Sequence, residues 1–196
     1  MPQFPRGAAR DQTAPLACCS DSRESLHAGA FVGRGGAWAL LGEREAGKSS
    51  TLAWLAKAGR EVVCDDMLIL EGGSAYFGPR SVDLRRETAE RLGAGAEIGL
   101  AGARERWRLR VGPGATEPEP LAGCIFLEWG ERVELEELSG PERLERLFVH
   151  RGLRLPPTDP SALLDVAARP GYQLRRPRGW EGLDDAVELL LERFGP

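Results

Sequence analysis

Apolar residues in this chain come in short blocks separated by glycine-rich or charged segments, a pattern typical of a mixed α/β fold. Residues 25–32 predict a first strand that contains His27, and residues 37–41 predict a second. The turn sequence Arg34-Gly35-Gly36 lies between them, so the two strands are expected to form a hairpin.

A helix is predicted directly after this hairpin. Leu52, Leu55 and Ala56 recur at helical spacing within residues 50–58, and Gly59 stands where a glycine commonly ends a helix. A further apolar run over residues 61–70 predicts a strand, interrupted by the adjacent carboxylates Asp65 and Asp66.

The remaining pattern predicts an alternation of strands and helices, with no internal repeat. Strands are expected at 74–77, 107–111, 121–129 and 172–175, and helices at 82–92, 141–149, 161–168 and 183–194. The Ala/Gly-rich residues 93–103 are expected to form a mobile loop. Residues 1–24 are polar and aperiodic and predict a disordered or irregular tail, leaving 25–196 as one domain.

Composition narrows the class of protein. The net charge of −4 over 196 residues, with a pI near 5.4, argues against a dedicated nucleic-acid binder. No apolar run has the length of a membrane helix, and the N-terminus lacks an apolar signal core, so we expect a cytoplasmic protein. Reduced thiols are then expected, with Cys64 and Cys124 in the core.

The chain contains no asparagine, which excludes two common classes of phosphate-transfer protein. Ordinary GTPases recognise guanine through an Asn-Lys-x-Asp motif, and ordinary protein kinases hold their second metal ion with an asparagine.

The segment between the second strand and the first helix matches the phosphate-binding pattern G-x-x-x-x-G-K-[ST] without a gap. Glycines at both ends of this loop let the backbone turn tightly and leave N–H groups open to an anion. The residues expected to surround the phosphates of ATP are Gly42, Glu43, Arg44, Glu45, Ala46, Gly47, Lys48, Ser49 and Ser50.

Within this loop, Lys48 is expected to reach the β- and γ-phosphates, and the Ser49 hydroxyl to bind Mg²⁺. Lys48 is one of only two lysines in an arginine-rich chain, the other being Lys57. A compact ammonium at this position is consistent with phosphate binding.

Three more polar residues belong to the predicted catalytic group. Asp65 and Asp66 suit phosphoryl transfer, in which one carboxylate holds Mg²⁺ and the other accepts a proton from an attacking hydroxyl. We expect Asp65 to be the base and Asp66 the metal ligand, with the reverse assignment open. His27 supports them, whereas His150 is expected to be a surface residue near a helix end.

Residues 26–70 resemble the catalytic domain of HPr kinase/phosphorylase, a bacterial serine kinase. The resemblance is carried by His27, the Gly42–Ser49 loop and the Asp65–Asp66 pair. It implies an α/β fold with a P-loop nucleotide-binding core of the HPr kinase and phosphoenolpyruvate carboxykinase type, and ATP and Mg²⁺ as cofactors.

Two departures from that family's pattern bear on the substrate. The acidic residue that usually follows the loop serine is replaced by Ser50, and residues 77–85 keep arginines but lack the family's Glu-Arg signature. The chain in these respects resembles HPr-kinase-like proteins of biosynthetic clusters, some of which resemble kinases of lasso peptides. Arg80, Arg85 and Arg86 are candidates for binding an acidic substrate or a transferring phosphoryl group.

The leading hypothesis is an ATP- and Mg²⁺-dependent serine kinase acting on a peptide or protein. A small-molecule kinase on the same core and a nucleotide-binding regulator without turnover remain open, as does a homo-oligomer. Neither a nucleic acid nor a membrane is expected as a partner.

Overall fold

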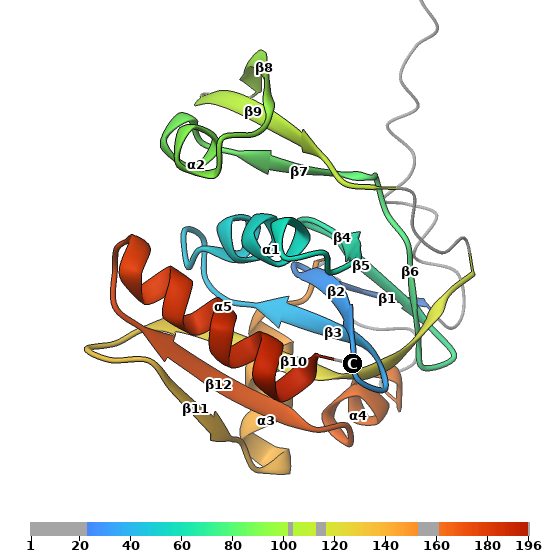
Figure 1. Cartoon of the computed structure of the whole chain (residues 1–196). Helices are drawn as coiled ribbons and strands as arrows, with labels where there is room; N and C mark the ends of the chain where they lie inside the picture. Colours follow the sequence, from blue (N-terminus) through green and yellow to red (C-terminus); the bar gives the residue numbers. More distant parts are fainter. Residues whose placement is uncertain (1–22, 102–103, 113–116, 153–160, 196) are drawn as a thin grey trace, which may run out of the picture.

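The computed structural model describes residues 23–101, 104–112, 117–152 and 161–195, and shows a mixed α/β fold around a central sheet (Figure 1). Residues 1–22 of the predicted tail lie outside these residues, and its last two, Arg23 and Glu24, belong to a strand instead. The strands are β1 (Arg23–Leu26), β2 (Gly29–Gly33), β3 (Gly36–Leu41), β4 (Val62–Cys64), β5 (Leu68–Glu71), β6 (Ser74–Tyr76), β7 (Ser81–Leu84), β8 (Ala96–Ala101), β9 (Arg104–Arg110), β10 (Glu119–Trp129), β11 (Glu134–Glu137) and β12 (Gly171–Arg176). The helices are α1 (Lys48–Lys57), α2 (Arg86–Leu92), α3 (Gly140–Val149), α4 (Ser161–Ala167) and α5 (Trp180–Phe194).

The larger sheet has nine strands, and its main path runs β1-β5-β6-β10-β3-β2-β4. β10 pairs in parallel with both β3 and β12, and β11 joins the free side of β12 in antiparallel. β2 pairs antiparallel with β3, as the predicted hairpin requires, and β4 pairs antiparallel with β2. β3, β4, β10 and β12 therefore all point the same way.

Helices cover both faces of the sheet, because successive strand residues face opposite sides. Leu40 and Ile125 pack with α1 and α5, whereas their neighbours Leu41 and Phe126 pack with α3 and α4. All four side chains are at most 1% exposed. The two layers of core residues fix the helices at opposite faces of one sheet.

A second, three-stranded sheet of order β7-β9-β8 lies on the far side of α1 (Figure 1). Val82 and Leu84 of β7 are buried in the same core cluster as α1 residues Leu52 and Leu55. α1 is thus enclosed between the two sheets, which accounts for apolar residues around much of its circumference.

The predicted strand over residues 25–32 is two strands. β1 pairs with β5 and β2 pairs with β3, so the chain changes neighbours between them. His27 and Ala28 fall in this break, and the His27 N–H donates to the His150 carbonyl at 2.7 Å instead of to a ladder. The alternation of apolar and polar residues does not show where the chain changes from one neighbouring strand to another.

Two predictions for residues 82–101 were wrong in part. Residues 81–84 are strand β7, because Val82 and Leu84 alternate inward, and the helix begins only at Arg86. The expected mobile loop contains β8, which pairs with β9 through a register shift at Gly99, where φ is +78°. Backbone pairing outweighs the weak strand preference of alanine and glycine here.

Two other expectations, the buried thiols and the glycine at the end of α1, are confirmed. Cys64 and Cys124 are buried free thiols, and burial raises the pKa of Cys124 to about 12. Gly59, just beyond α1, has a φ of +83°. Among the described residues, no helix combines the length and apolar character needed to cross a bilayer.

Leu40→Ala should lower the free energy of unfolding by about 2–5 kcal/mol, because the side chain is fully buried between the sheet and α1. Chemical denaturation measures this. Leu100→Ala is the matched control, since Leu100 is 76% exposed and should change stability by less than about 0.5 kcal/mol. Equal effects of the two substitutions would contradict the layer assignment.

Candidate active site at the carboxyl edge of the sheet

The predicted site residues lie together at one edge of the sheet, where the parallel strands have their carboxyl ends. The Gly42–Ser49 loop follows β3, and Asp65 and Asp66 follow β4. His27 precedes β2, whose start pairs with the end of β3. Open α/β sheets bind ligands outside the carboxyl ends of their strands.

The Gly42–Ser49 loop connects β3 to α1 as the motif requires. Gly47 caps α1 with a left-handed φ of +95°, and Gly42 has a φ of +155°. A Cβ at Gly42 would lie 2.9 Å from the Leu127 carbonyl oxygen, so both glycines are needed sterically. The loop directs the N-terminus of a ten-residue helix at the edge, where an anion is favoured.

Lys48 is held inside the loop. The residue is only 8% exposed, and its ammonium donates to the carbonyls of Gly42 at 2.7 Å and Glu43 at 3.3 Å. Burial lowers the pKa of Lys48, opposed by the charges of Asp66, Asp65 and Glu43. A cation is therefore enclosed beside the backbone that would surround phosphates.

Asp65 is joined directly to the loop. The Ser49 hydroxyl donates to Asp65 Oδ1 at 3.0 Å, and the Asp83 backbone N–H donates to Oδ2 at 3.2 Å. Burial raises the pKa of Asp65 to about 6, against these two hydrogen bonds, which lower it. Two hard oxygen ligands, one hydroxyl and one carboxylate, thus lie together at the start of α1.

Asp66 differs from its neighbour in exposure and backbone. Its φ is +73°, rare for a residue with a side chain, and its side chain is 81% exposed. His27 Nδ1 lies 3.3 Å from Asp66 Oδ1 and 3.1 Å from the Asp66 carbonyl oxygen. The turn after β4 consequently directs one carboxylate toward Ser49 and leaves the other beside His27 in solvent.

The outer part of the loop is tied to the smaller sheet region. Glu45, at a φ of +72°, pairs with Arg85 at 2.6 Å and Arg104 at 2.7 Å, and these arginines lower the pKa of Glu45. Glu43 and Arg44 are exposed. Of the three arginine candidates, Arg85 thus reaches the loop itself.

The other two arginine candidates are held by carboxylates of their own. Arg80 lies 3.4 Å from Glu61, and Arg86 lies 2.9 Å from Glu105. Arg85 therefore contacts the loop through Glu45, whereas Arg80 and Arg86 form ion pairs with residues outside the loop.

His150 was wrongly expected at the surface. It ends α3, is half-buried, and contacts the Phe126 ring at a centroid distance of 6.2 Å. Burial lowers the pKa of His150, with further effects from the charges of Glu43, Lys48 and His27. It belongs near the loop, and the helix periodicity around it carried no signal of that position.

Two more residues that the sequence did not single out for this edge are Trp129 and Arg176. They end β10 and β12, the two strands parallel to β3. The Arg176 guanidinium lies 4.4 Å from the centre of the Trp129 ring. Only the parallel pairing, which the sequence does not reveal, places them beside the loop.

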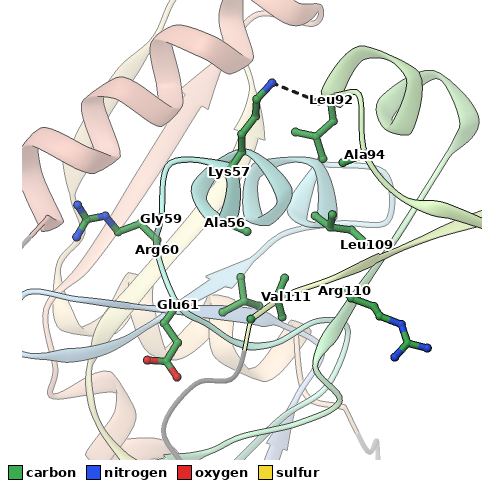
Figure 2. Close-up of a pocket in the computed structure, with 12 residues that line it drawn as sticks. Ala56, Lys57, Gly59, Arg60, Glu61, Leu92, Ala94, Leu109, Arg110 and Val111 are labelled. Atoms are coloured by element: carbon green, nitrogen blue, oxygen red, sulfur yellow. Dashed lines mark hydrogen bonds between the residues drawn. The ribbon is translucent and has the colours of Figure 1, made fainter.

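A pocket of about 470 Å³ lies at the other end of α1 (Figure 2). Leu92, Ala94, Leu109 and Val111 line it, and Lys57 closes one side by donating to the Leu92 carbonyl at 3.2 Å. The labelled side chains of Arg60, Glu61 and Arg110 point away from the apolar lining (Figure 2). Catalytic sites need convergent polar groups, so the carboxyl edge is the better candidate.

The donor set at the edge fits Mg²⁺, which prefers oxygen ligands and keeps water and substrate phosphates in its coordination shell. Ser49 and Asp65 would supply oxygens, with Asp66 adjacent. Within the described residues, no three His, Cys, Asp or Glu side chains cluster as a preformed metal site.

Comparison with known proteins gives a likeness to solved structures but not to a family model or a curated sequence. No family model matches the chain, and no curated protein matches its sequence. Among solved structures, the chain is similar to the Hpr(Ser) kinase/phosphatase from Coxiella burnetii, at 17% identity and a TM-score of 0.38. The match covers 87% of this chain and 96% of that chain.

Asp65→Asn should stabilise the metal-free protein near pH 7.5 by about 1–3 kcal/mol, because an ionised carboxylate is partly desolvated there. The folded pKa of about 6 exceeds the ordinary 3.8, so wild-type stability should fall as pH rises from about 4 to about 6. The variant should lack this component. Thermal unfolding across that range, in chelator, measures it.

Asp185→Asn is the control, since Asp185 is exposed on α5. Its melting curve should follow the wild type at every pH. A stability gap for Asp65→Asn that persists unchanged below pH 4 would contradict a burial effect on the Asp65 carboxylate.

Proposed function

We propose that this protein is an ATP- and Mg²⁺-dependent kinase that transfers the γ-phosphoryl group to a serine hydroxyl of a peptide or protein. The observation that carries the proposal is the Ser49–Asp65 hydrogen bond at the start of α1, beside the enclosed Lys48. A loop that binds phosphates, an oxygen pair suited to Mg²⁺ and a second exposed carboxylate are the components that phosphoryl transfer requires.

Lys48 and the loop N–H groups would hold the phosphates of ATP. Lys48 now donates to the carbonyls of Gly42 and Glu43, so phosphate oxygens would compete for the same ammonium protons. Bound Mg²⁺ would supply charge neutralisation of the β- and γ-phosphates.

The two aspartates would divide the remaining work. The Ser49 contact supports Asp65 as the metal-side carboxylate, the reverse of our first expectation, and the exposure of Asp66 supports it as the base. In the reaction, Asp66 accepts the proton of the serine hydroxyl while that oxygen bonds to the γ-phosphorus. The bond from phosphorus to the β–γ bridging oxygen breaks, and ADP leaves.

His27 would orient the Asp66 turn. Its Nδ1 lies within 3.3 Å of both an Asp66 carboxylate oxygen and the Asp66 carbonyl. The 81% exposure of Asp66 supports an acceptor as large as a peptide, because the base is not enclosed in a small-molecule cavity.

Lys48→Ala should reduce ATP-dependent phosphorylation of serine peptides at least 100-fold while the fold is retained, because charge stabilisation of phosphates dominates such sites. Radiolabel transfer from γ-labelled ATP to a serine peptide library measures it. The matched control is Lys57→Ala at the other lysine, which lies in the last turn of α1 and donates to the Leu92 carbonyl of α2, away from the loop. Transfer undiminished in Lys48→Ala would exclude the loop as the active site.

Asp65→Asn and Asp66→Asn should fail in different ways. Loss of the metal-side carboxylate at Asp65 should raise the Mg²⁺ concentration needed for activity and weaken Mg·ATP binding. Loss of the base at Asp66 should lower kcat about 100- to 10,000-fold with Mg·ATP binding largely kept. Titrations of Mg²⁺ and ATP against both variants separate the roles, and two mild, identical phenotypes would mean that neither carboxylate is catalytic.

A further inference from the structure

Arg176 is a buried arginine directed at the loop. It ends β12, is only 4% exposed, and reaches the cap of α1. A Cβ built on Gly47 would lie 2.3 Å from Arg176 Nη2, so the guanidinium occupies the space that a side chain at Gly47 would fill. A cation is therefore pressed against the N-terminus of the helix.

The guanidinium has no anionic partner within the described part of the chain. Nη1 donates to the Pro177 carbonyl at 3.3 Å, and Nε is buried without an acceptor. Burial lowers the pKa of Arg176 to about 10, with no carboxylate opposing it. Arg151, by contrast, is also largely buried but lies 3.1 Å from Glu24.

A buried arginine without a counter-charge is unfavourable, and proteins seldom keep one unless something binds it. The helix N-terminus next to Arg176 also favours an anion. The buried Arg176 guanidinium and the N-terminus of α1 thus both favour a negative charge at the same place.

Trp129 explains how Arg176 is held although no carboxylate in the described parts of the chain pairs with it. The Arg176 guanidinium lies over its ring at 4.4 Å, an attraction between a cation and the ring face. Stacking uses the face of the planar guanidinium and leaves its N–H edge available for an anion. Arg178 also lies over this ring, at 4.9 Å, but is exposed.

We propose that Arg176 is a second cationic phosphate ligand of the site, binding a non-bridging oxygen of a bound polyphosphate chain opposite Lys48, with Trp129 as its positioning residue. This inference rests on the proposed function and deepens it. It also gives Gly47 a second role, because any side chain there would displace the guanidinium.

The test compares Arg176→Met, Arg176→Lys and the matched control Arg178→Met, with Mg·ATP and Mg·pyrophosphate as probes in calorimetry. Arg176→Met should weaken binding of both probes about 10- to 100-fold, as expected for loss of a charge-assisted contact. Arg176→Lys should also weaken the binding of both probes, since an ammonium can neither stack on the ring nor donate two parallel hydrogen bonds as a guanidinium does. Arg178→Met should bind both within about threefold of wild type.

Melting temperatures without ligand separate binding from a structural role. Arg176→Met should melt at or above the wild-type temperature, because it removes an unpaired buried charge. If Arg176→Met does not fold, the affinity of folded Arg176→Lys decides, and wild-type affinity in that variant overturns the proposal.

The outcomes also distinguish this inference from the function on which it rests. If Lys48→Ala loses polyphosphate binding but Arg176→Met binds both probes as tightly as wild type, the arginine proposal is wrong and the loop assignment stands. If the wild-type chain itself binds neither ATP nor pyrophosphate, both are overturned.

Discussion

The candidate site depends on the parallel pairing of β10 with β3 on one side and β12 on the other. Because of this pairing, β3, β10 and β12 end at the same edge, where the Gly42–Ser49 loop, Trp129 and Arg176 follow or end them. Because parallel strands require buried faces, the layers of α1 and α5 on one side and α3 and α4 on the other are part of the same constraint. Loss of that packing would separate the site residues before it altered any of them.

The charges gathered at this edge are unfavourable for folding. Lys48 and Arg176 are both buried, and burial raises the pKa of Asp65, so each would gain from solvation or from a partner of opposite charge. A polyphosphate with a bound divalent cation would bring negative charge to Lys48 and Arg176 and positive charge to Asp65. The burial of the apolar core offsets the unfavourable burial of these charges, as expected where function and stability compete.

Local parts of the site could be predicted from sequence, whereas parts assembled over long distances could not. The Gly42–Ser49 loop, its flanking strand and α1 follow from neighbouring residues, and the hairpin follows from Gly35 and Gly36. His150 and Arg176 reach the loop only through strand order and helix placement, which periodicity does not encode. The same limit explains the missed break at His27, where β1 and β2 take different partners.

The two buried cations near the loop are of different kinds for a physical reason. Lys48 rises from the first turn of α1 and must fit among loop carbonyls, which a compact ammonium with freely oriented donors can do. Arg176 approaches from β12 across the sheet edge and lies on an aromatic ring, with no carboxylate partner among the described residues. A lysine there would be strongly hydrated and poorly stacked, so burial would favour its neutral form. A guanidinium stays charged under the same desolvation. A buried side chain at the end of a strand can attract an anion only if it keeps its charge, which arginine does and lysine there would not.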